Sequence, residues 1–434
     1  MRTSLLLCVA ALVVGAPLRA QTDSVLLRRA LRLHREVPVI DGHNDLPWKV
    51  RAYGRDGSAP ADASRPRLSL DSVDIGRPQP ALMTDIPRLR AGRVGGQFWS
   101  LWIPNELVPS GSARTTLEQI DITRRLMARY PRDFLLATTA ADVWRAHRTG
   151  RIAALLGIEG GHAIENSLPV LRAFAELGVR YMTLTHNTTL AWVDAASDSA
   201  RHNGLTPFGR EVVREMNRLG VLVDLSHVSD SVMAQAIRLS EAPVIFSHSS
   251  ARALADHPRN VPDGILRMLP QNGGVVMVNF YCDFIDSTRV RWNRERRADS
   301  LSERARFGAD SVAVRQALTS WEAAHPQPPA PALAIVADHI DHVRQVAGID
   351  HVGYGSDFDG IDCAPTGLED VSAFPWLTAE LLRRGYSDED AKQVIGLNTL
   401  RVMRQAEAVA ARLSRERGPS TATLYQLDSA VVRP

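Results

Sequence analysis

The sequence predicts an α/β protein, a (β/α)8 TIM barrel with insertions, and three observations favour this fold. Apolar runs alternate with helical patterns along most of the 434 residues. Most of these runs are almost continuously apolar, as expected of parallel strands that are buried on both faces. Eight such runs are the number that closes this barrel. The expected strands cover residues 37–41, 97–103, 152–158, 181–185, 221–225, 243–247, 273–279 and 351–355.

Helical patterns separate the expected strands. Thr206 and Pro207 precede a segment with apolar residues on one face, and Gly220 follows it. A threonine cap, a proline at the first helical position and a glycine after the last turn are typical helix boundaries. Helices are expected at residues 24–36, 167–178, 206–220 and 337–348.

Three segments do not belong to this alternation. Residues 52–67 are rich in Gly, Ser, Pro and Ala and are expected to form a loop. Residues 134–138 resemble a ninth strand, which we place outside the barrel. Residues 286–331 are a longer insertion after the seventh strand, on the catalytic side of a barrel. This insertion is arginine-rich, and the sequence leaves open whether it is a helical lid or a solvated helical excursion.

The chain is expected to divide into a signal peptide (1–20), the barrel (21–415) and a polar carboxyl-terminal tail (416–434). Arg2 precedes an apolar run from Leu5 to Val14, and small residues follow this run. The run is shorter than the roughly 20 apolar residues that cross a bilayer. We therefore expect an exported protein, periplasmic or secreted, without a membrane span.

Composition limits the partners and the ligand types. The net charge is only +3 and the basic residues are dispersed, so no nucleic-acid partner is expected. Cys282 and Cys363 are the cysteines that remain after removal of the signal peptide. A disulfide between them and two free buried thiols are equal alternatives at this stage. Two cysteines are too few to form the ligand set of a metal site, so metal ligands must come from His, Asp and Glu.

Polar side chains of ligand type recur at the ends of the expected strands. His43 and Asp45 follow the first strand, and their spacing puts both on one face. The carboxyl ends of barrel strands converge on one mouth, so residues far apart in sequence meet there. The further candidates at strand ends are Glu159, His186, His227, His248 and Asp357, with Asp359 nearby.

Each candidate also has a purely structural explanation. A single histidine is more often a hydrogen-bonded core residue than a ligand. Glu159 can cap the following turn, and Asp357 can be a helix N-cap. Repetition at equivalent places favours a metal site. Two divalent cations about 3.5–4 Å apart can share a carboxylate and a hydroxide. Glu159 is the natural shared carboxylate, with His43 and Asp45 on one side and His227 and His248 on the other.

The chain resembles the membrane (renal) dipeptidases, which are two-zinc barrel enzymes of the amidohydrolase type. The matching phrases follow one another in the order of that family, from about residue 37 to residue 400. They are DGHNDLPW (41–48), GGQFWS (95–100), EGGH (159–162), LTHN (184–187), DLSH (224–227), SHSS (247–250), RNVPD (259–263) and GSDFDG (355–360).

The resemblance implies two Zn2+ per chain and a ligand set for each. One ion would be held by His43, Asp45 and Glu159, and the other by Glu159, His227 and His248. The 286–331 insertion is longer than we expect of this family, and we expect no counterpart of the lipid anchor of animal members. The sequence does not determine the oligomeric state, and a homodimer is compatible with it.

The resemblance also implies the roles of three further residues. His186 would contact the substrate and the developing oxyanion, Arg259 would bind the terminal carboxylate, and Asp357 would handle protons. The expected activity is hydrolysis of dipeptides, including those with a D-residue at the carboxyl side, by a metal-bridging hydroxide. Alternatives are a related amidohydrolase acting on N-acyl amino acids, lactones, β-lactams or cell-wall-derived peptides, and a non-catalytic binding barrel.

Overall fold

Eight parallel strands close into a barrel, as the sequence predicts. The computed structural model describes residues 15–52, 73–108 and 110–428. The ring runs β2-β1-β9-β8-β7-β6-β5-β4, and it closes because β2 also pairs with β4. The barrel strands are β1 (Val39–Asn44), β2 (Val94–Trp102), β4 (Ile152–Glu159), β5 (Val179–Thr183), β6 (Leu222–Asp224), β7 (Ile245–Phe246), β8 (Val275–Val278) and β9 (Val352–Tyr354).

The segment that we placed outside the barrel does lie outside it. This strand, β3 (Phe134–Leu136), pairs in parallel with residues 152–154 of β4. Farther along, β4 pairs with β5 instead, from Leu156 onward. The β3 strand therefore occupies only the amino-terminal part of the β4 edge, and it leaves the ring of eight intact.

Helices cover the outside of the barrel, and their boundaries follow local sequence signals. In α7 the Thr206 side chain accepts a hydrogen bond from the Gly209 amide, and Gly220 ends the helix with φ 70°. The α-helices are α1 (Gly15–Glu36), α2 (Leu46–Ala52), α3 (Ile86–Ala91), α4 (Ser112–Arg129), α5 (Ala140–Arg148), α6 (Leu168–Glu176), α7 (Pro207–Leu219), α8 (Asp230–Leu239), α9 (Asp263–Leu266), α10 (Leu269–Asn272), α11 (Cys282–Ile285), α12 (Ser287–Phe307), α13 (Ser311–Ala324), α14 (Ala334–Ala347), α15 (Phe374–Arg383), α16 (Asp388–Lys392), α17 (Asn398–Glu416) and α18 (Leu424–Leu427).

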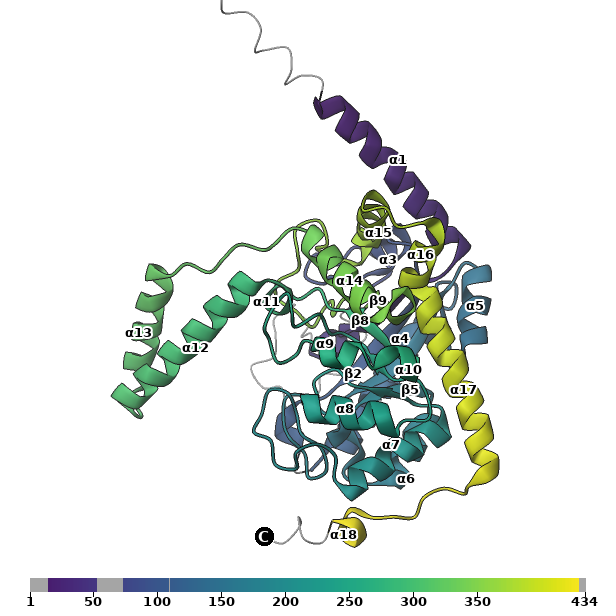
Figure 1. Ribbon diagram of the computed structural model, residues 1–434, viewed down its shortest axis with the longest axis vertical. Coiled ribbons are helices and arrows are strands. Elements are labelled where there is room, and N and C mark those ends of the chain that lie inside the picture. Colours follow the sequence, from purple (N-terminus) through teal and green to yellow (C-terminus); the bar gives the residue numbers. More distant parts are fainter. Residues whose placement is uncertain (1–14, 53–72, 109, 429–434) are drawn as a thin grey trace, which may run out of the picture.

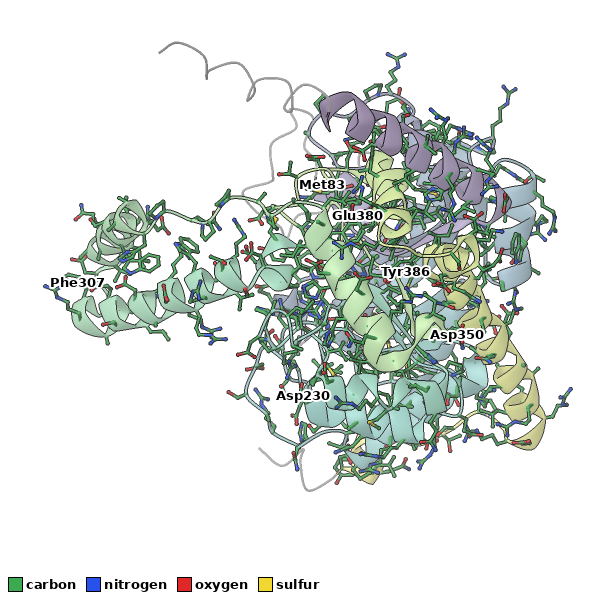
Figure 2. The ribbon with its side chains drawn as sticks, turned by 45° about the horizontal axis from the view of Figure 1, so that its top comes forward. Met83, Asp230, Phe307, Asp350, Glu380 and Tyr386 are labelled. Carbon is green, nitrogen blue, oxygen red and sulfur yellow. A yellow bond between two sulfur atoms is a disulfide. The ribbon has the colours of Figure 1, made fainter. Side chains whose placement is uncertain are left out.

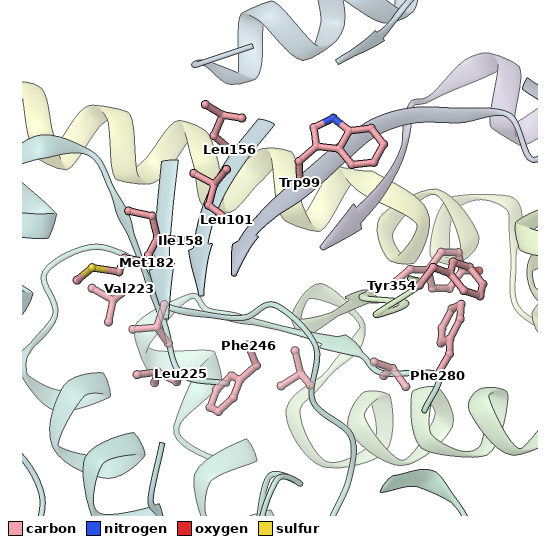
Figure 3. Packing of buried hydrophobic residues seen from close by; sticks show 14 of the residues in the cluster. Trp99, Leu101, Leu156, Ile158, Met182, Val223, Leu225, Phe246, Phe280 and Tyr354 are labelled. Atoms are coloured by element: carbon pink, nitrogen blue, oxygen red, sulfur yellow. The ribbon is translucent and has the colours of Figure 1, made fainter. Parts of the chain in front are cut away.

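Alternation along the strands divides the core into an inner and an outer layer. Ala153 and Leu155 of β4 belong to the cluster that fills the barrel. Leu156 and Ile158 belong to the larger cluster between the barrel and its helices, part of which is shown in Figure 3. Glu159 continues the inner row of β4, because side chains two residues apart point the same way. The last residue of β4 therefore faces the barrel mouth.

The arginine-rich insertion forms a helical hairpin of α12 and α13, which projects from the barrel (Figures 1 and 2). Trp292 and Trp321 contact each other between the two helices, with ring centroids 5.6 Å apart. At its base, Arg289 pairs with Asp283 at 2.6 Å. The arginines expected here, Arg289, Arg291, Arg294, Arg296 and Arg297, all lie on α12. The insertion is thus helical, and its role as a lid stays a prediction.

Cys282 and Cys363 form a disulfide, which decides between the two alternatives left open by the sequence. It joins the start of α11 to the loop after β9. Part of the polar tail is also ordered: Asp428 is buried and accepts hydrogen bonds from the Thr206 hydroxyl and the Phe208 amide at the start of α7. The tail thereby adds a second cap to that helix.

Two expectations fall largely outside the described residues. The signal peptide (1–20) is described only from residue 15, where α1 begins, nine residues before the expected start of that helix. The expected loop 52–67 is described only at Ala52, the last residue of α2. Among the described residues, none of the helices combines the length and apolar composition that a bilayer crossing requires.

Candidate metal centre

The barrel mouth brings together every metal-ligand candidate that the sequence predicts. His43 lies in β1, Asp45 directly after it, and Glu159 is the last residue of β4. His227 and His248 lie within three residues of the ends of β6 and β7. Residues more than 200 positions apart in the chain thus share one buried cluster.

Glu159 lies at the centre of this cluster, and its two oxygens face different histidines. Oε2 is 3.4 Å from Nε2 of His43. Oε1 is 2.9 Å from Nε2 of His227 and 3.4 Å from Nε2 of His248. A carboxylate with one oxygen toward each of two ligand groups has the arrangement needed to bridge two cations.

The remaining nitrogen of each histidine is held from outside the cluster. Nδ1 of His43 is 2.8 Å from the Tyr181 hydroxyl, and Nδ1 of His248 is 2.7 Å from the Ser247 hydroxyl. Nδ1 of His227 is 3.1 Å from Oδ1 of Asn187. Such contacts fix the ring orientation of metal-binding histidines. All three Nε2 atoms are thereby directed at Glu159.

A glycine makes room for one of these outer contacts. A Cβ atom on Gly157 would lie 2.1 Å from the Tyr181 ring, far inside contact distance. The absence of a side chain at Gly157 lets the tyrosine cross β4 inside the barrel and reach His43. The buried hydroxyl of Tyr181 then contacts an imidazole nitrogen instead of remaining unpaired.

The protonation of Glu159, His227 and His248 suits metal ligands. Burial lowers the pKa of His227 and of His248 well below the usual value, so both rings are neutral at physiological pH. Burial raises the pKa of Glu159, but the charges of His43 and His186 outweigh it and hold that pKa well below its usual range. Neutral imidazole and ionised carboxylate are the ligand forms that metals require. Burial lowers the pKa of His43, but Tyr181, Glu159 and Asp45 outweigh it and hold that pKa well above its usual value, so a bound cation would replace the His43 proton.

Buried polar atoms without partners provide a direct test of whether a metal fits. Within the described residues, Nε2 of His43 and Oδ1 of Asp45 are buried and have no hydrogen-bond partner. The same histidine nitrogen lies 3.4 Å from Asp45, 3.4 Å from Glu159 and 4.0 Å from Asp357. A divalent cation would satisfy these atoms and balance the converging carboxylates. The residues present therefore fit bound metal.

The ligand atoms form three overlapping groups within 4.8 Å, and none of the three coincides with an expected set. His43 groups with Glu159 and His248, although the expected sets assign the two histidines to different ions. Asp357 groups with His43 and Asp45, while His186 groups with Glu159 and His227. His186 is the more distant of these, with Nε2 3.9 Å from Oε1 of Glu159. Both residues thus lie close enough to the cluster to act on a molecule bound there.

Asp357 occupies a constrained position beside the cluster. Its backbone is left-handed, with φ 67°, which is uncommon for a residue other than glycine. Nδ2 of Asn279 donates to Oδ2 of Asp357 at 2.9 Å, and the Asp357 amide donates to the His43 carbonyl at 3.1 Å. Burial, together with the charges of Asp45 and Glu159, raises the pKa of Asp357 to about 7 against the opposing charge of His43.

Arg259 contributes a buried positive charge to the same cavity, which has a volume of 420 Å³. Nη1 lies 3.4 Å from the Ser249 hydroxyl, Nη2 lies 3.3 Å from the His248 carbonyl, and the guanidinium lies 5.3 Å from the Phe284 ring. Burial lowers its pKa to about 10, so Arg259 stays charged at neutral pH. No carboxylate among the described residues forms an ion pair with it.

The wider chain matches a known family. A family model described as membrane dipeptidase (peptidase family M19) covers residues 27–417. The chain belongs to this family. It is therefore a metallo-dipeptidase, and the family resemblance given by the sequence motifs is confirmed.

Curated relatives of this dipeptidase extend over most of its length. Dipeptidase verJ of Clonostachys rogersoniana is 41% identical over 398 residues, which is 89% of each chain. Dipeptidase 3 of Rattus norvegicus is 39% identical over 393 residues, which is 89% of this chain and 69% of that protein.

Solved structures share the fold at lower sequence identity. The probable dipeptidase PvdM from Pseudomonas aeruginosa has a TM-score of 0.72 and 24% identity, and the match covers 89% of this chain and all of that one (100%). A metallo peptidase from Rhodobacter sphaeroides has a TM-score of 0.66 and 23% identity over 85% of this chain and 99% of that one. These likenesses support the barrel fold.

The residues that orient the side chains of the candidate site were not predicted from the sequence. Tyr181, Asn187 and Asn279 were not identified as site residues, although each contacts a predicted one. Asn279 carried a usable signal, because it follows Val275 and Met277 in the inward row of its strand. Tyr181 carried no such signal, since in sequence a tyrosine in the middle of a buried strand cannot be distinguished from an ordinary core residue.

Replacing Tyr181 by Phe tests how the His43 ring is held. We expect Tyr181→Phe to weaken metal binding by about 10- to 100-fold, the usual cost of losing a contact to a metal-binding histidine. Metal content after dialysis against a graded series of metal buffers is the measurement. Tyr354→Phe is the matched control, because this equally buried barrel tyrosine contacts Thr378 instead. Equal metal affinity in the two variants would contradict the prediction.

Proposed function

We propose that this enzyme hydrolyses dipeptides with two zinc ions held at the barrel mouth. The proposal rests on the position of Glu159. One of its carboxylate oxygens faces Nε2 of His43, and the other faces Nε2 of both His227 and His248. His43 and Asp45 would complete one site, and His227 and His248 the other. When bound, such a metal pair supplies a nucleophile at neutral pH and polarises the peptide carbonyl.

Arg259 would fix the carboxyl end of the substrate. Its guanidinium is buried, charged and free of any ion pair within the described chain, and it lines the same cavity as Glu159. Arginine binds carboxylates in a two-pronged geometry, which fixes orientation as well as position. A cavity of 420 Å³ closed by such a residue favours a short substrate with a free carboxylate.

His186 and Asp357 would assist the reaction from opposite sides of the cluster. The His186 ring lies 4.5 Å from the His227 ring, and Nε1 of Trp102 donates to Nδ1 of His186 at 3.5 Å. In the tautomer in which Nδ1 accepts this bond, Nε2 carries the proton and can donate to a developing oxyanion. Asp357, held by Asn279 and with its pKa raised to about 7, is suited to pass a proton to the leaving amine.

The stereochemical preference and the cellular location are also part of the proposal. The Rhodobacter sphaeroides structure contains a phosphinate mimic of L-Ala-D-Ala, which supports acceptance of a D-residue at the carboxyl side. The disulfide between Cys282 and Cys363 fits an oxidising compartment and supports export. Signal-peptide cleavage itself would be read from the amino-terminal sequence of the mature protein.

Metal removal provides the first test of the function. We expect two zinc ions per chain, and we expect hydrolysis of both L-Ala-L-Ala and L-Ala-D-Ala to be lost with chelator and restored by added zinc. The measurement is a metal count alongside amino-acid release. A metal-replete preparation that is inert across a panel of dipeptides would instead indicate a non-catalytic binding barrel.

Replacing Arg259 by Ala tests recognition of the substrate carboxylate. A lost charged hydrogen bond costs about 1.5–3 kcal/mol, so KM for L-Ala-L-Ala should rise by roughly 10- to 150-fold. The matched control is L-Ala-L-Ala amide, which lacks the carboxylate and should be hydrolysed equally by both enzymes. If Arg259→Ala impairs the acid and the amide alike, Arg259 does not act through the substrate carboxylate. If the variant spares an ester or lactone instead, the alternative substrates gain support.

Replacing Asp357 by Asn tests proton transfer. The amide keeps an oxygen for the Asn279 contact but cannot transfer the proton, so kcat should fall by roughly 10²- to 10⁴-fold. Zinc content should stay near that of the unmodified enzyme, since Asp357 is outside the proposed ligand sets. Unchanged turnover would remove the assigned role, and loss of one zinc would make Asp357 a ligand.

A further inference from the structure

The amino-terminal face of the barrel carries a cavity that the dipeptidase reaction does not use. Its volume is 240 Å³, and it lies where α1, α3 and α5 meet the first residues of β2 and β4. The lining contains no carboxylate side chain. The basic residues in the lining are His34, Arg35, Arg90, Arg93, His147 and Arg151.

We propose that this cavity binds a small multivalent oxyanion, of the size of phosphate, pyrophosphate or citrate. Arg90 already has a partner, because its Nε donates to Asp133 at 2.9 Å. For Arg35, Arg93 and Arg151, no ion pair with a carboxylate exists among the described residues. Unpaired like charges around one cavity repel one another, and an anion that accepts from several guanidinium groups removes that cost.

The pairing of β2 with β4 brings two of these arginines to the same end of the barrel. Gly96 of β2 pairs with Ala153 of β4. Arg93 lies three residues before Gly96, and Arg151 lies two residues before Ala153, so the two arginines differ by one residue in register and both line the cavity. Nε of Arg151 donates to the Thr149 hydroxyl at 3.1 Å, which leaves its terminal nitrogens for a ligand.

The backbone at Arg93 is a second indication. This residue is left-handed, with φ 57°, in the short turn between α3 and β2. Glycine and asparagine are the residues that adopt this conformation most readily. The chain keeps an arginine there in spite of the strain, and that arginine lines the cavity. The left-handed turn thus places Arg93 at the cavity, where this residue is exposed to solvent.

The cavity and the metal centre lie at opposite ends of the barrel. Ile152 lines the cavity, and Glu159 lies at the other end of the same strand. At about 3.3 Å per residue these ends are roughly 23 Å apart. An anion bound at the amino-terminal face cannot touch the substrate. The bound anion instead stabilises the fold, because it links α1, α3 and α5 to the first residues of β2 and β4.

The test uses the full, metal-loaded chain and three probes: inorganic phosphate, pyrophosphate and citrate. Thermal unfolding midpoints are compared with those in sodium chloride at equal ionic strength, and affinity is measured by calorimetry. We expect at least one probe to raise the midpoint of the unmodified enzyme. In the double variant Arg93→Gln, Arg151→Gln, we expect this rise to disappear and binding to weaken by roughly tenfold or more, while kcat for dipeptides stays unchanged.

The matched control is the double variant Arg125→Gln, Arg267→Gln, which removes the same charge from exposed arginines elsewhere. It should retain the full rise in midpoint. Equal responses in the two double variants would overturn the proposal, as would binding that disappears when the metals are removed, since the probe would then occupy the metal centre. If the cavity variant does not fold, Arg35→Gln alone provides the same comparison, because Arg35 is exposed at the end of α1.

Discussion

The site depends on one shared carboxylate. Glu159 is buried at the end of β4, and its two oxygens face His43 on one side and His227 with His248 on the other. A buried ionised carboxylate is costly unless positive charge or hydrogen bonds compensate for it. The surrounding histidines provide that compensation, and cations in the proposed sites would add to it. The position of Glu159 therefore determines where the other proposed ligands must lie.

The barrel supplies the positions that this carboxylate requires. Alternation along β4 sends Ala153, Leu155 and Glu159 inward, so that two core residues and one ligand share a row. Tyr181 then links the packed interior to the site, since its ring belongs to the inner cluster and its hydroxyl contacts His43. The orientation of a ligand thus depends on the packing of the layer beneath it.

The walls of the cavity beside Glu159 come from segments that the strands do not position directly. Tyr281, which precedes α11, and Phe284, within it, line the cavity, as do Ile361 and Asp362 from the loop after β9. The disulfide from Cys282 ties these two segments together. Each cysteine is next to a residue of the cavity wall, Cys282 beside Tyr281 and Cys363 beside Asp362. The disulfide therefore holds the two wall segments together without adding a polar group to the cavity.

The sequence by itself determined the strand number, the helix limits at Thr206 and Gly220, the family and the candidate ligand residues that meet at the mouth. Periodicity, capping and motif order can be read directly from the chain. Tertiary structure decided the Cys282–Cys363 disulfide, the helical hairpin, and the contacts of Tyr181, Asn187 and Asn279. It also decided the arginine cavity. These features join residues that are distant in the chain, and only closure of the barrel sets how near they come and which atoms they present.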